Sequence, residues 1–239
     1  MDGGADDLDR ARRAVRDTYD DIAAHFASTR EYPWPEVEAF LADAPPGRLG
    51  VDVGCGNGRH AEPMAGRVDR VVGVDVSRGL LDAARERATE RAFDVELLQG
   101  DAAGLPLAAD CADLAVYVAT IHHLPDRASR VRSLDELARV LAPGGRALVS
   151  AWSTAHDRFD AESVPASEAS GGSPDEQRGS GGGFDTTVDW TLPGGGTVPR
   201  FYHVYDPAEF RADVADSALA LDGFEVSSGN CYAEVSPAD

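Results

Sequence analysis

The stretch Val51-Asp52-Val53-Gly54-Cys55-Gly56-Asn57-Gly58-Arg59 decides the fold. Its first residues read as the end of a buried strand, and three glycines at alternate positions then lead toward a helix. Glycine adopts positive φ readily and leaves room for a ligand to lie against the backbone. In a doubly wound sheet, this turn lies at the carboxyl ends of the strands, where ligands bind. The stretch therefore predicts a ligand-binding loop directly after the first strand.

Strands and helices alternate around this loop. Apolar runs predict strands at residues 49–53, 71–74, 95–98, 114–118 and 147–152. One helix is expected to begin after Ser77 as N-cap, and another to cover residues 126–141 and to end at Pro143-Gly144-Gly145. Such alternation predicts an α/β fold of the Rossmann-like, doubly wound type with helices on both faces of a mostly parallel sheet.

The chain is predicted to be a single domain with four parts. Residues 1–44 form an N-terminal helical cap, residues 45–152 the cofactor-binding core, and residues 153–185 a flexible insertion rich in Ser and Gly. Residues 186–239 form the substrate-side and C-terminal strands, with strands expected at 187–192, 201–205, 224–226 and 231–235. A helix is expected after Asp206, with Glu209 completing a capping box.

The acid before the glycine loop distinguishes between phosphate and cationic ligands. The dinucleotide fingerprint G-x-G-x-x-G binds a pyrophosphate at a helix N-terminus. Here the spacing is G-x-G-x-G, and Asp52 stands two residues before Gly54. Its carboxylate would repel a pyrophosphate and attract the ammonium and sulfonium groups of S-adenosylmethionine. We therefore expect S-adenosylmethionine, and a nicotinamide oxidoreductase is disfavoured.

Two later acids extend this pattern. Asp75 ends the second predicted strand, where a carboxylate can accept both ribose hydroxyls, and Asp101 follows the third, where it can accept from the adenine amino group. Taken singly, each could be a solvated turn carboxylate. Together with the loop, they make residues 48–152 resemble the class I S-adenosylmethionine-dependent methyltransferases, whose last strand is antiparallel. The resemblance implies a cofactor site formed by Tyr19, Asp52, Gly54, Cys55, Gly56, Asn57, Gly58, Asp75, Val76, Asp101, Ala102 and Ala119.

Further segments resemble a narrower family. They are residues 19–30 (YDDIAAHFASTR) with the following Pro-Trp-Pro at 33–35, residues 52–60 (DVGCGNGRH), residues 119–124 (ATIHHL), Trp152, and residues 200–205 (RFYHVY). They look like the tRNA wobble-uridine carboxymethyl methyltransferases, a family also found as a domain of an animal AlkB-type tRNA protein. The resemblance implies methyl esterification of 5-carboxymethyluridine at the tRNA wobble position.

This reaction predicts a clamp for the acceptor and no general base. A carboxylate with a pKa near 4 is ionised at neutral pH, so the enzyme must only align nucleophile, methyl and sulfur, which can supply up to ~7–11 kcal/mol. Arg30 would be the carboxylate or phosphate fork, His122 would lie where the acceptor meets the methyl, and Trp152 would stack on the uridine. The nominated catalytic residues are Arg30, His122, Trp152, Arg200 and His203.

Each nominated residue also has a plainer interpretation. Arg30 could pair with Glu31 or Glu36 at the surface, and one of the adjacent His122 and His123 should be structural. His203 and the tryptophans could be ordinary core residues. The three cysteines show neither disulfide nor zinc spacing, and the six histidines show no ligand spacing, so no metal is expected.

Charge is the unusual feature of the composition. Asp and Glu number 42 against 22 basic residues, all of them Arg, for a formal net charge of −20. This favours adaptation to a salt-rich cytosol as in halophilic organisms, because at about 1 M salt the Debye length is near 3 Å. A GC-rich genome would explain the Arg bias but not the acidity. Neither a signal peptide nor a membrane span is apparent, and we expect a cytoplasmic protein.

A tRNA-binding protein needs basic surface, which this chain offers only locally. Two Arg-rich stretches, residues 10–16 and 127–132, could contact phosphates or could be solvated helix faces. The family resemblance also implies a small zinc-binding activator subunit that forms a heterodimer along a sheet edge, expected at residues 95–98. The expected partners are therefore tRNA and this activator, with no membrane and no DNA.

Two other functions stay open from the sequence. A small-molecule methyltransferase acting on a quinone-like or other metabolite shares the same core and would show an apolar acceptor pocket. A non-catalytic module that binds S-adenosylmethionine without turnover is the alternative from another class.

Overall fold

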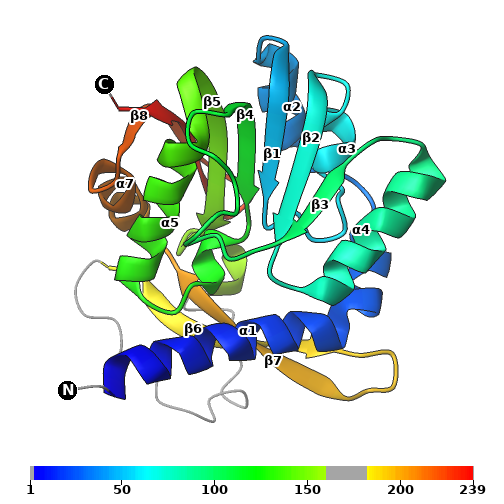
Figure 1. Cartoon of the computed structure of the whole chain (residues 1–239). Coiled ribbons are helices and arrows are strands. Elements are labelled where there is room, and N and C mark those ends of the chain that lie inside the picture. The colour runs from blue at the N-terminus through cyan, green and yellow to red at the C-terminus, as the bar shows by residue number, and fades with distance from the viewer. Residues whose placement is uncertain (1–2, 160–181, 239) are drawn as a thin grey trace.

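The computed structural model describes residues 3–159 and 182–238. Most of the predicted insertion, residues 160–181, lies outside this description. The described chain forms a seven-stranded sheet in the order β3-β2-β1-β4-β5-β9-β8 and a separate two-stranded sheet, β6-β7 (Figure 1). All pairs from β3 to β5 are parallel, whereas β9 is antiparallel to both β5 and β8. The predicted fold class is confirmed, including the antiparallel last strand.

The elements follow the predicted alternation. The strands of the large sheet, in spatial order, are β3 (Glu96–Gln99), β2 (Val68–Asp75), β1 (Gly47–Val53), β4 (Ala112–Val118), β5 (Leu141–Trp152), β9 (Asn230–Pro237) and β8 (Leu219–Ser227). The small sheet pairs β6 (Phe184–Thr191) with β7 (Thr197–Val204). The helices are α1 (Gly3–Ser28), α2 (Pro35–Asp43), α3 (Ala61–Met64), α4 (Arg78–Arg91), α5 (Arg127–Val140) and α7 (Pro207–Ala215), with short 3₁₀ turns η1 (Ile121–His123) and η2 (Asp157–Phe159).

Alternate residues of the strands feed two cores, one on each face of the sheet. Val51 and Val53 of β1 join side chains of α5 and α7, among them Leu134 and Phe210, in the larger core. The opposite face packs against α2 and α3. Because successive strand residues point to opposite faces, a strand buried on both sides must be apolar throughout. This explains the continuous apolar runs that predicted the strands.

Side-chain caps set the starts of three helices, and those at Ser77 and Asp206 were predicted. Ser77, Asp126 and Asp206 each accept a hydrogen bond from a backbone N–H in the first turn of α4, α5 and α7. The predicted capping box at Asp206 is wrong, because the Glu209 carboxylate accepts from Gly183 N and contacts His203. The predicted helix over residues 126–141 is confirmed as α5, Arg127–Val140, whereas the strand expected at 147–152 already begins at Leu141 and includes Pro143-Gly144-Gly145.

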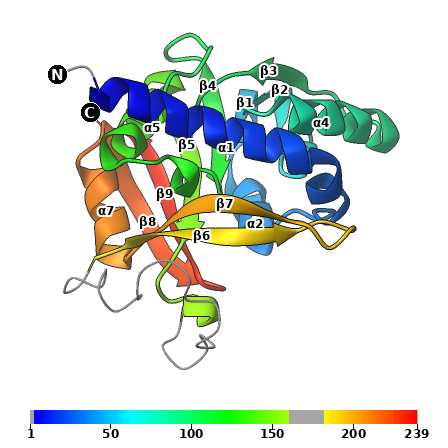
Figure 2. The ribbon, with the colours of Figure 1, turned by 90° about the horizontal axis from the view of Figure 1, so that it is seen from below.

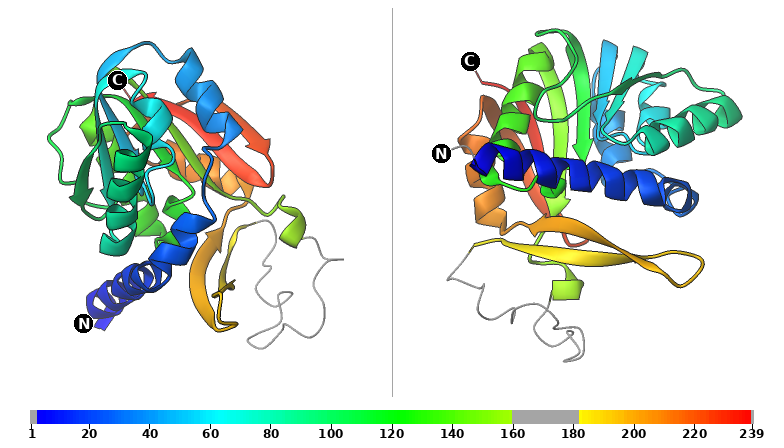
Figure 3. Two further views of the ribbon diagram at one scale, coloured as in Figure 1. Left: turned by 90° about the vertical axis from the view of Figure 1, so that its right-hand side faces the viewer. Right: turned by 60° about the horizontal axis from the view of Figure 1, so that its bottom comes forward.

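The N-terminal helix and the small sheet lie across the carboxyl ends of the parallel strands. Figures 1 and 2 show α1 running beneath the large sheet with the β6–β7 hairpin beside it, and Figure 3 shows the same arrangement from two further sides. Trp190 of β6 bridges the two elements, since its Nε1 donates to His25 Nδ1 of α1 at 3.0 Å. Both elements therefore border the edge of the sheet where the glycine loop ends. Within the described ranges, no helix is long and apolar enough to cross a bilayer.

Candidate functional site

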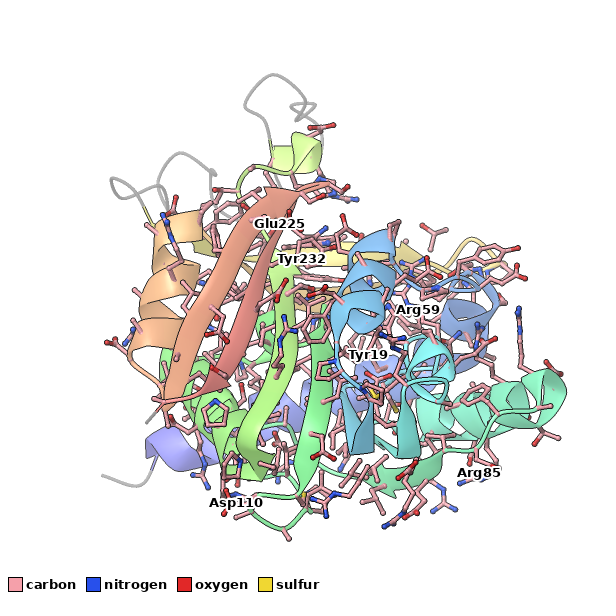
Figure 4. All side chains as sticks on the ribbon, turned by 90° about the horizontal axis from the view of Figure 1, so that it is seen from above. Tyr19, Arg59, Arg85, Asp110, Glu225 and Tyr232 are labelled. Atoms are coloured by element: carbon pink, nitrogen blue, oxygen red, sulfur yellow. The ribbon has the colours of Figure 1, made fainter. Side chains whose placement is uncertain are left out.

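A pocket opens at the carboxyl ends of β1, β2 and β4, where the strand order reverses between β1 and β4. The glycine loop forms its floor, and α1 covers it. Tyr19 from α1 and Arg59 from the loop, both labelled in Figure 4, contribute to its lining. Of the predicted cofactor residues, those that line it are Tyr19, Gly54, Cys55, Gly56, Asn57, Asp75, Val76, Asp101, Ala102 and Ala119. Asp52 and Gly58 lie behind this surface.

The glycines of the loop are required by its geometry. Gly54 has a φ of +68°, and a Cβ there would stand 2.2 Å from the Thr120 hydroxyl oxygen. Gly56 has a φ of +53°, and its N–H donates to the Asp75 carboxylate at 2.8 Å. The loop therefore packs closely on β4 at one glycine and is tied to β2 at the next. A side chain at Gly54 would be strained in conformation and would clash as well.

Two buried carboxylates lie behind the loop. Asp52 is 1% exposed, and its Oδ2 has no hydrogen-bond partner in the part of the chain that the structure describes. Burial and then the nearby charge of Asp75 raise the pKa of Asp52 to about 7. Burial also raises the pKa of Asp75 to about 6, although backbone N–H groups of Ser77 and Gly56 oppose this shift. An incompletely compensated pair of acids next to a pocket suits a cationic ligand and disfavours a phosphate. The residues present thus fit S-adenosylmethionine.

The two adjacent histidines have different roles. His123 lines the pocket: its Nε2 accepts from the Tyr19 hydroxyl at 2.8 Å, so its Nδ1 carries the proton that is donated to Phe201 O at 2.9 Å. His122 is buried, and its Nδ1 accepts from Trp152 N at 3.0 Å. Burial lowers the pKa of both, that of His123 to about 4, so both are neutral at pH 7. The structure thus brings His123, and not the nominated His122, to the pocket.

A basic and aromatic wall adjoins the pocket on the side of the β6–β7 hairpin. The guanidinium carbons of Arg30 and Arg200 lie 5.4 and 4.8 Å from the ring centroid of Trp190. Arg200 is 6% exposed, and neither arginine forms an ion pair with an acid in residues 3–159 or 182–238. Burial, and next the charge of Arg200, lower the pKa of Arg30. Two neighbouring guanidiniums without a carboxylate partner among the described residues can form charge-assisted hydrogen bonds to an external anion.

Tyr202 joins this wall to the strand ends. Its ring stacks on Trp152 at a centroid distance of 4.3 Å and an interplanar angle of 12°. It also contacts His122 and His123, at 5.0 and 4.6 Å. One face of Trp152 is therefore covered by Tyr202, so a stacked base would need the other face or a different ring.

The stretch that forms the glycine loop and its neighbouring strands matches a known family model. Residues 51–149 match the family model described as a methyltransferase domain. The predicted family and the predicted methyl donor, S-adenosylmethionine, agree with this match.

Curated proteins that resemble this chain are named as tRNA methyltransferases. Over 149 residues, 62% of this chain, it is 42% identical to the tRNA (carboxymethyluridine(34)-5-O)-methyltransferase of Xenopus tropicalis, covering 22% of that protein. It is 35% identical over 145 residues to the enzyme of the same name from Saccharomyces cerevisiae, covering 50% of it. The chain thus spans half or less of the length of these two relatives.

Solved structures share the fold over nearly the whole chain. The methyltransferase CcbJ from Streptomyces caelestis superposes with a TM-score of 0.65 at 20% identity, covering 95% of this chain and 98% of that one. A putative methyltransferase solved with the Trm112 methyltransferase activator of Haloferax volcanii superposes with a TM-score of 0.65 at 17% identity, covering 94% and 98%. At these identities, the likeness establishes the fold.

The five residues nominated for catalysis do not all lie together in the structure. It places Arg30 and Arg200 together at Trp190, with Trp152 and His122 behind Tyr202. His203 lies elsewhere, between the carboxylates of Asp185 and Glu209. Several residues that line the pocket were not predicted, among them Arg12, Arg59, Thr120 and His123. Arg59 directly follows the last glycine of the loop, and this position was the available signal.

The predicted basic stretches are largely neutralised by partners. Arg10, Arg12 and Arg16 pair with Asp7, Asp101 and Asp17 respectively. In the second stretch, Arg127 pairs with Asp213 and Asp216, and Arg130 is buried. These arginines mainly compensate acids of the protein itself, so the stretches give little free positive surface for phosphates.

Proposed function

We propose that this chain transfers a methyl group from S-adenosylmethionine to the carboxylate of 5-carboxymethyluridine at the tRNA wobble position. The observation that carries the proposal is the pair of guanidiniums, Arg30 and Arg200, held at Trp190 beside the pocket. In a chain with a net charge of −20, two such cations lacking an acidic partner in the described structure mark a site for an anionic acceptor. The names of the relatives at 35–42% identity supply the acceptor's identity.

The residues of the chain position the acceptor and are not required to take a proton from it. The carboxylate is ionised at neutral pH, so it is already nucleophilic. When bound, S-adenosylmethionine supplies an electrophilic methyl group on a sulfonium. Arg30 and Arg200 would orient the carboxylate by charge-assisted hydrogen bonds. Neutral His123, fixed between Tyr19 and Phe201 O, would border the acceptor without competing for the same cations.

The aromatic groups fit an unstacked pyrimidine. Recognition of single-stranded RNA relies on stacking, and each base–aromatic stack contributes about 1–3 kcal/mol. Trp190 and Tyr202 both contact Arg200, whose guanidinium carbon lies 4.8 and 5.1 Å from their ring centroids. A flat base and an anionic substituent could therefore be bound on one wall. This arrangement favours a nucleoside carboxylate over the apolar quinone-like acceptor of the alternative function.

A second subunit is part of the proposal. β3 is an edge strand, pairs only with β2 in the described sheet, and exposes Glu96 and Gln99. An edge strand offers unpaired N–H and C=O groups to a partner strand. One structural neighbour was solved with the Trm112 methyltransferase activator. We infer that a small zinc-binding activator adds a strand along β3, which gel filtration of the co-expressed chains would test. A chain that remains monomeric and fully active alone would contradict this inference.

The cellular setting follows from the same proposal. An enzyme that modifies tRNA would work in the cytoplasm, and the excess of acids would suit a salt-rich one. Salt weakens exposed phosphate contacts, so binding would depend more on stacking and on the partly buried arginines. Activity on tRNA that rises between about 0.1 and 2 M KCl would support this setting.

Nucleoside mass spectrometry tests the function directly. In tRNA from a deletion strain, carboxymethyluridine should accumulate and its methyl ester should disappear. Unchanged wobble nucleosides would refute the substrate assignment. In vitro, Arg200→Met should raise the KM for a carboxymethyluridine stem-loop by about tenfold or more, while Arg85→Met, which alters an exposed pair with Asp82, should not. Binding of S-adenosylmethionine without transfer to any RNA would favour the non-catalytic alternative.

A further inference from the structure

His203 lies at a junction between the small sheet and the last helix. It is 5% exposed, and its cross-strand partner in the β6–β7 register is Asp185. Its Nδ1 lies 2.7 Å from an Asp185 oxygen, and its Nε2 lies 2.9 Å from a Glu209 oxygen. The second Glu209 oxygen accepts from Gly183 N at 2.7 Å. A residue nominated for catalysis thus contacts two carboxylates and does not line the pocket.

The two contacts determine the charge of the imidazole. A neutral imidazole has one N–H, and its other nitrogen is an acceptor. A carboxylate at neutral pH only accepts, so a neutral His203 would direct a lone pair at one of its two partners. Two short contacts to two carboxylates therefore require an imidazolium that donates from both nitrogens. Burial lowers the pKa of His203, but the hydrogen bonds to Asp185 and Glu209 outweigh it and raise the pKa overall.

The surrounding charges alternate in sign only when His203 is protonated. Glu209 of α7 is 3.8 Å from buried Arg130 of α5, and Arg130 is 3.8 Å from Asp213 of α7. Asp213 in turn pairs with Arg127 at 2.7 Å. Among the described residues, the other groups that face His203 are Asp185 of β6, the edge-on ring of Tyr205 at 4.6 Å, and the neutral His122 of η1. The charge of Arg130 also acts on His203 and opposes its protonation. Removing the proton would leave Asp185 and Glu209 without the cation between them.

The position of His203 along β7 connects this junction to the basic and aromatic wall beside the pocket, which is called the acceptor wall from here on. Successive strand residues point to opposite sides, so Arg200 and Tyr202 share one side and His203 takes the other. Arg200 contacts Trp190, and Tyr202 contacts Trp152 and the pocket residue His123, whereas His203 contacts Glu209 of α7. We propose that His203, as an imidazolium, is a positioning residue that attaches the β6–β7 hairpin to α7 and so holds Arg200 and Tyr202 at the acceptor wall. The expected effect on acceptor binding rests on the proposed function, whereas the attachment of the hairpin to α7 does not.

Two measurements on the free chain test the attachment without any acceptor. In an NMR titration, the ring signal that is lost in His203→Gln identifies His203. In the parent protein this signal should give a pKa above the usual histidine value of about 6.5, and in Glu209→Gln the pKa should be lower. Glu38→Gln makes the same chemical change at an exposed position of α2 and should leave the pKa of His203 unchanged. Amide exchange at residues 184–204 should be faster in His203→Gln than in the parent at the same pH, with β1 and β4 unchanged. A neutral His203 at pH 7, or unchanged exchange in the hairpin, would overturn the proposal.

The acceptor side needs a separate readout. With a carboxymethyluridine stem-loop, His203→Gln should raise KM by about tenfold while the affinity for S-adenosylhomocysteine stays within about twofold. The alkaline limit of activity should move to lower pH in Glu209→Gln. If His203→Gln does not fold, Asp185→Asn and Glu209→Gln carry the same tests. A parent protein that is inactive on the stem-loop but shows the NMR and exchange results would contradict the proposed function and leave the attachment supported.

Discussion

Replacing Asp52 by Asn tests whether the buried charge of this carboxylate destabilises the free protein and strengthens the binding of a cationic ligand. Asp52 is buried with a pKa of about 7, against 3.8 when exposed. The acid is harder to ionise in the folded state than in the unfolded state. Ionised Asp52 therefore lowers the free energy of unfolding. This loss is small below pH 4, grows as the pH rises, and levels off above about pH 7.

The size of this cost follows from the shift. About 3 pKa units at about 1.4 kcal/mol each give a destabilisation of about 4 kcal/mol above pH 7. The Asn amide would take the place of Oδ2, which has no partner in the described structure, and would cost about 1–3 kcal/mol as an unsatisfied group. Asp52→Asn should thus be about 2 kcal/mol more stable than the parent at pH 8 and less stable at pH 4.

Urea unfolding at pH 4, 6 and 8 at one fixed salt concentration measures the first half of this prediction. Calorimetry with S-adenosylmethionine measures the second, because losing the carboxylate should weaken binding by about tenfold. Asp222→Asn, at an exposed position of β8, removes the same formal charge and should change neither quantity. A stability difference that does not depend on pH, or unchanged affinity in Asp52→Asn, would refute the electrostatic reasoning for this site.

Three further substitutions test other parts of the structure. Gly54→Ala should abolish cofactor binding measured by calorimetry, because its Cβ would lie 2.2 Å from the Thr120 hydroxyl at a φ of +68°. Binding within about twofold of the parent would contradict the loop geometry. Tyr19→Phe should lower kcat, because it removes the hydroxyl that donates to His123 Nε2. The free energy of thermal unfolding should fall by only about 1 kcal/mol. An unchanged kcat would mean that this hydrogen bond to His123 does not contribute to the reaction. Ser77→Ala should cost about 1–2 kcal/mol in urea unfolding, because Ser77 accepts from Leu80 N at the start of α4; an unaltered midpoint would mean that the cap contributes nothing.

Several features depend only on near neighbours in the chain, and these could be predicted. The apolar runs gave the strands, since a strand buried on both faces needs apolar residues at every position. The caps Ser77 and Asp206 could be predicted because a cap accepts a hydrogen bond from a backbone N–H two or three residues away. The spacing of Gly54, Gly56 and Gly58 with Asp52 before them indicated the cofactor loop for the same local reason.

The acceptor side of the site could be predicted only by resemblance to a family. Nothing local to His122 and His123 tells which of them reaches the pocket, and the choice made from the sequence was His122. His123 is selected by a hydrogen bond to Tyr19, 104 positions away. The junction at His203 likewise depends on three elements meeting, β6, β7 and α7.

The sequence by itself therefore determined the sheet, its helix starts and the cofactor loop, whose energetics lie in backbone conformation and in hydrogen bonds between nearby residues. Only the tertiary structure decided which cations lack acidic partners among the described residues, and where those cations lie. Arg30 and Arg200 meet at Trp190 because α1 and the β6–β7 hairpin pack together, with His25 bonded to Trp190 across 165 positions. Charge compensation is set by distances in space, and those distances exist only once the distant segments have packed.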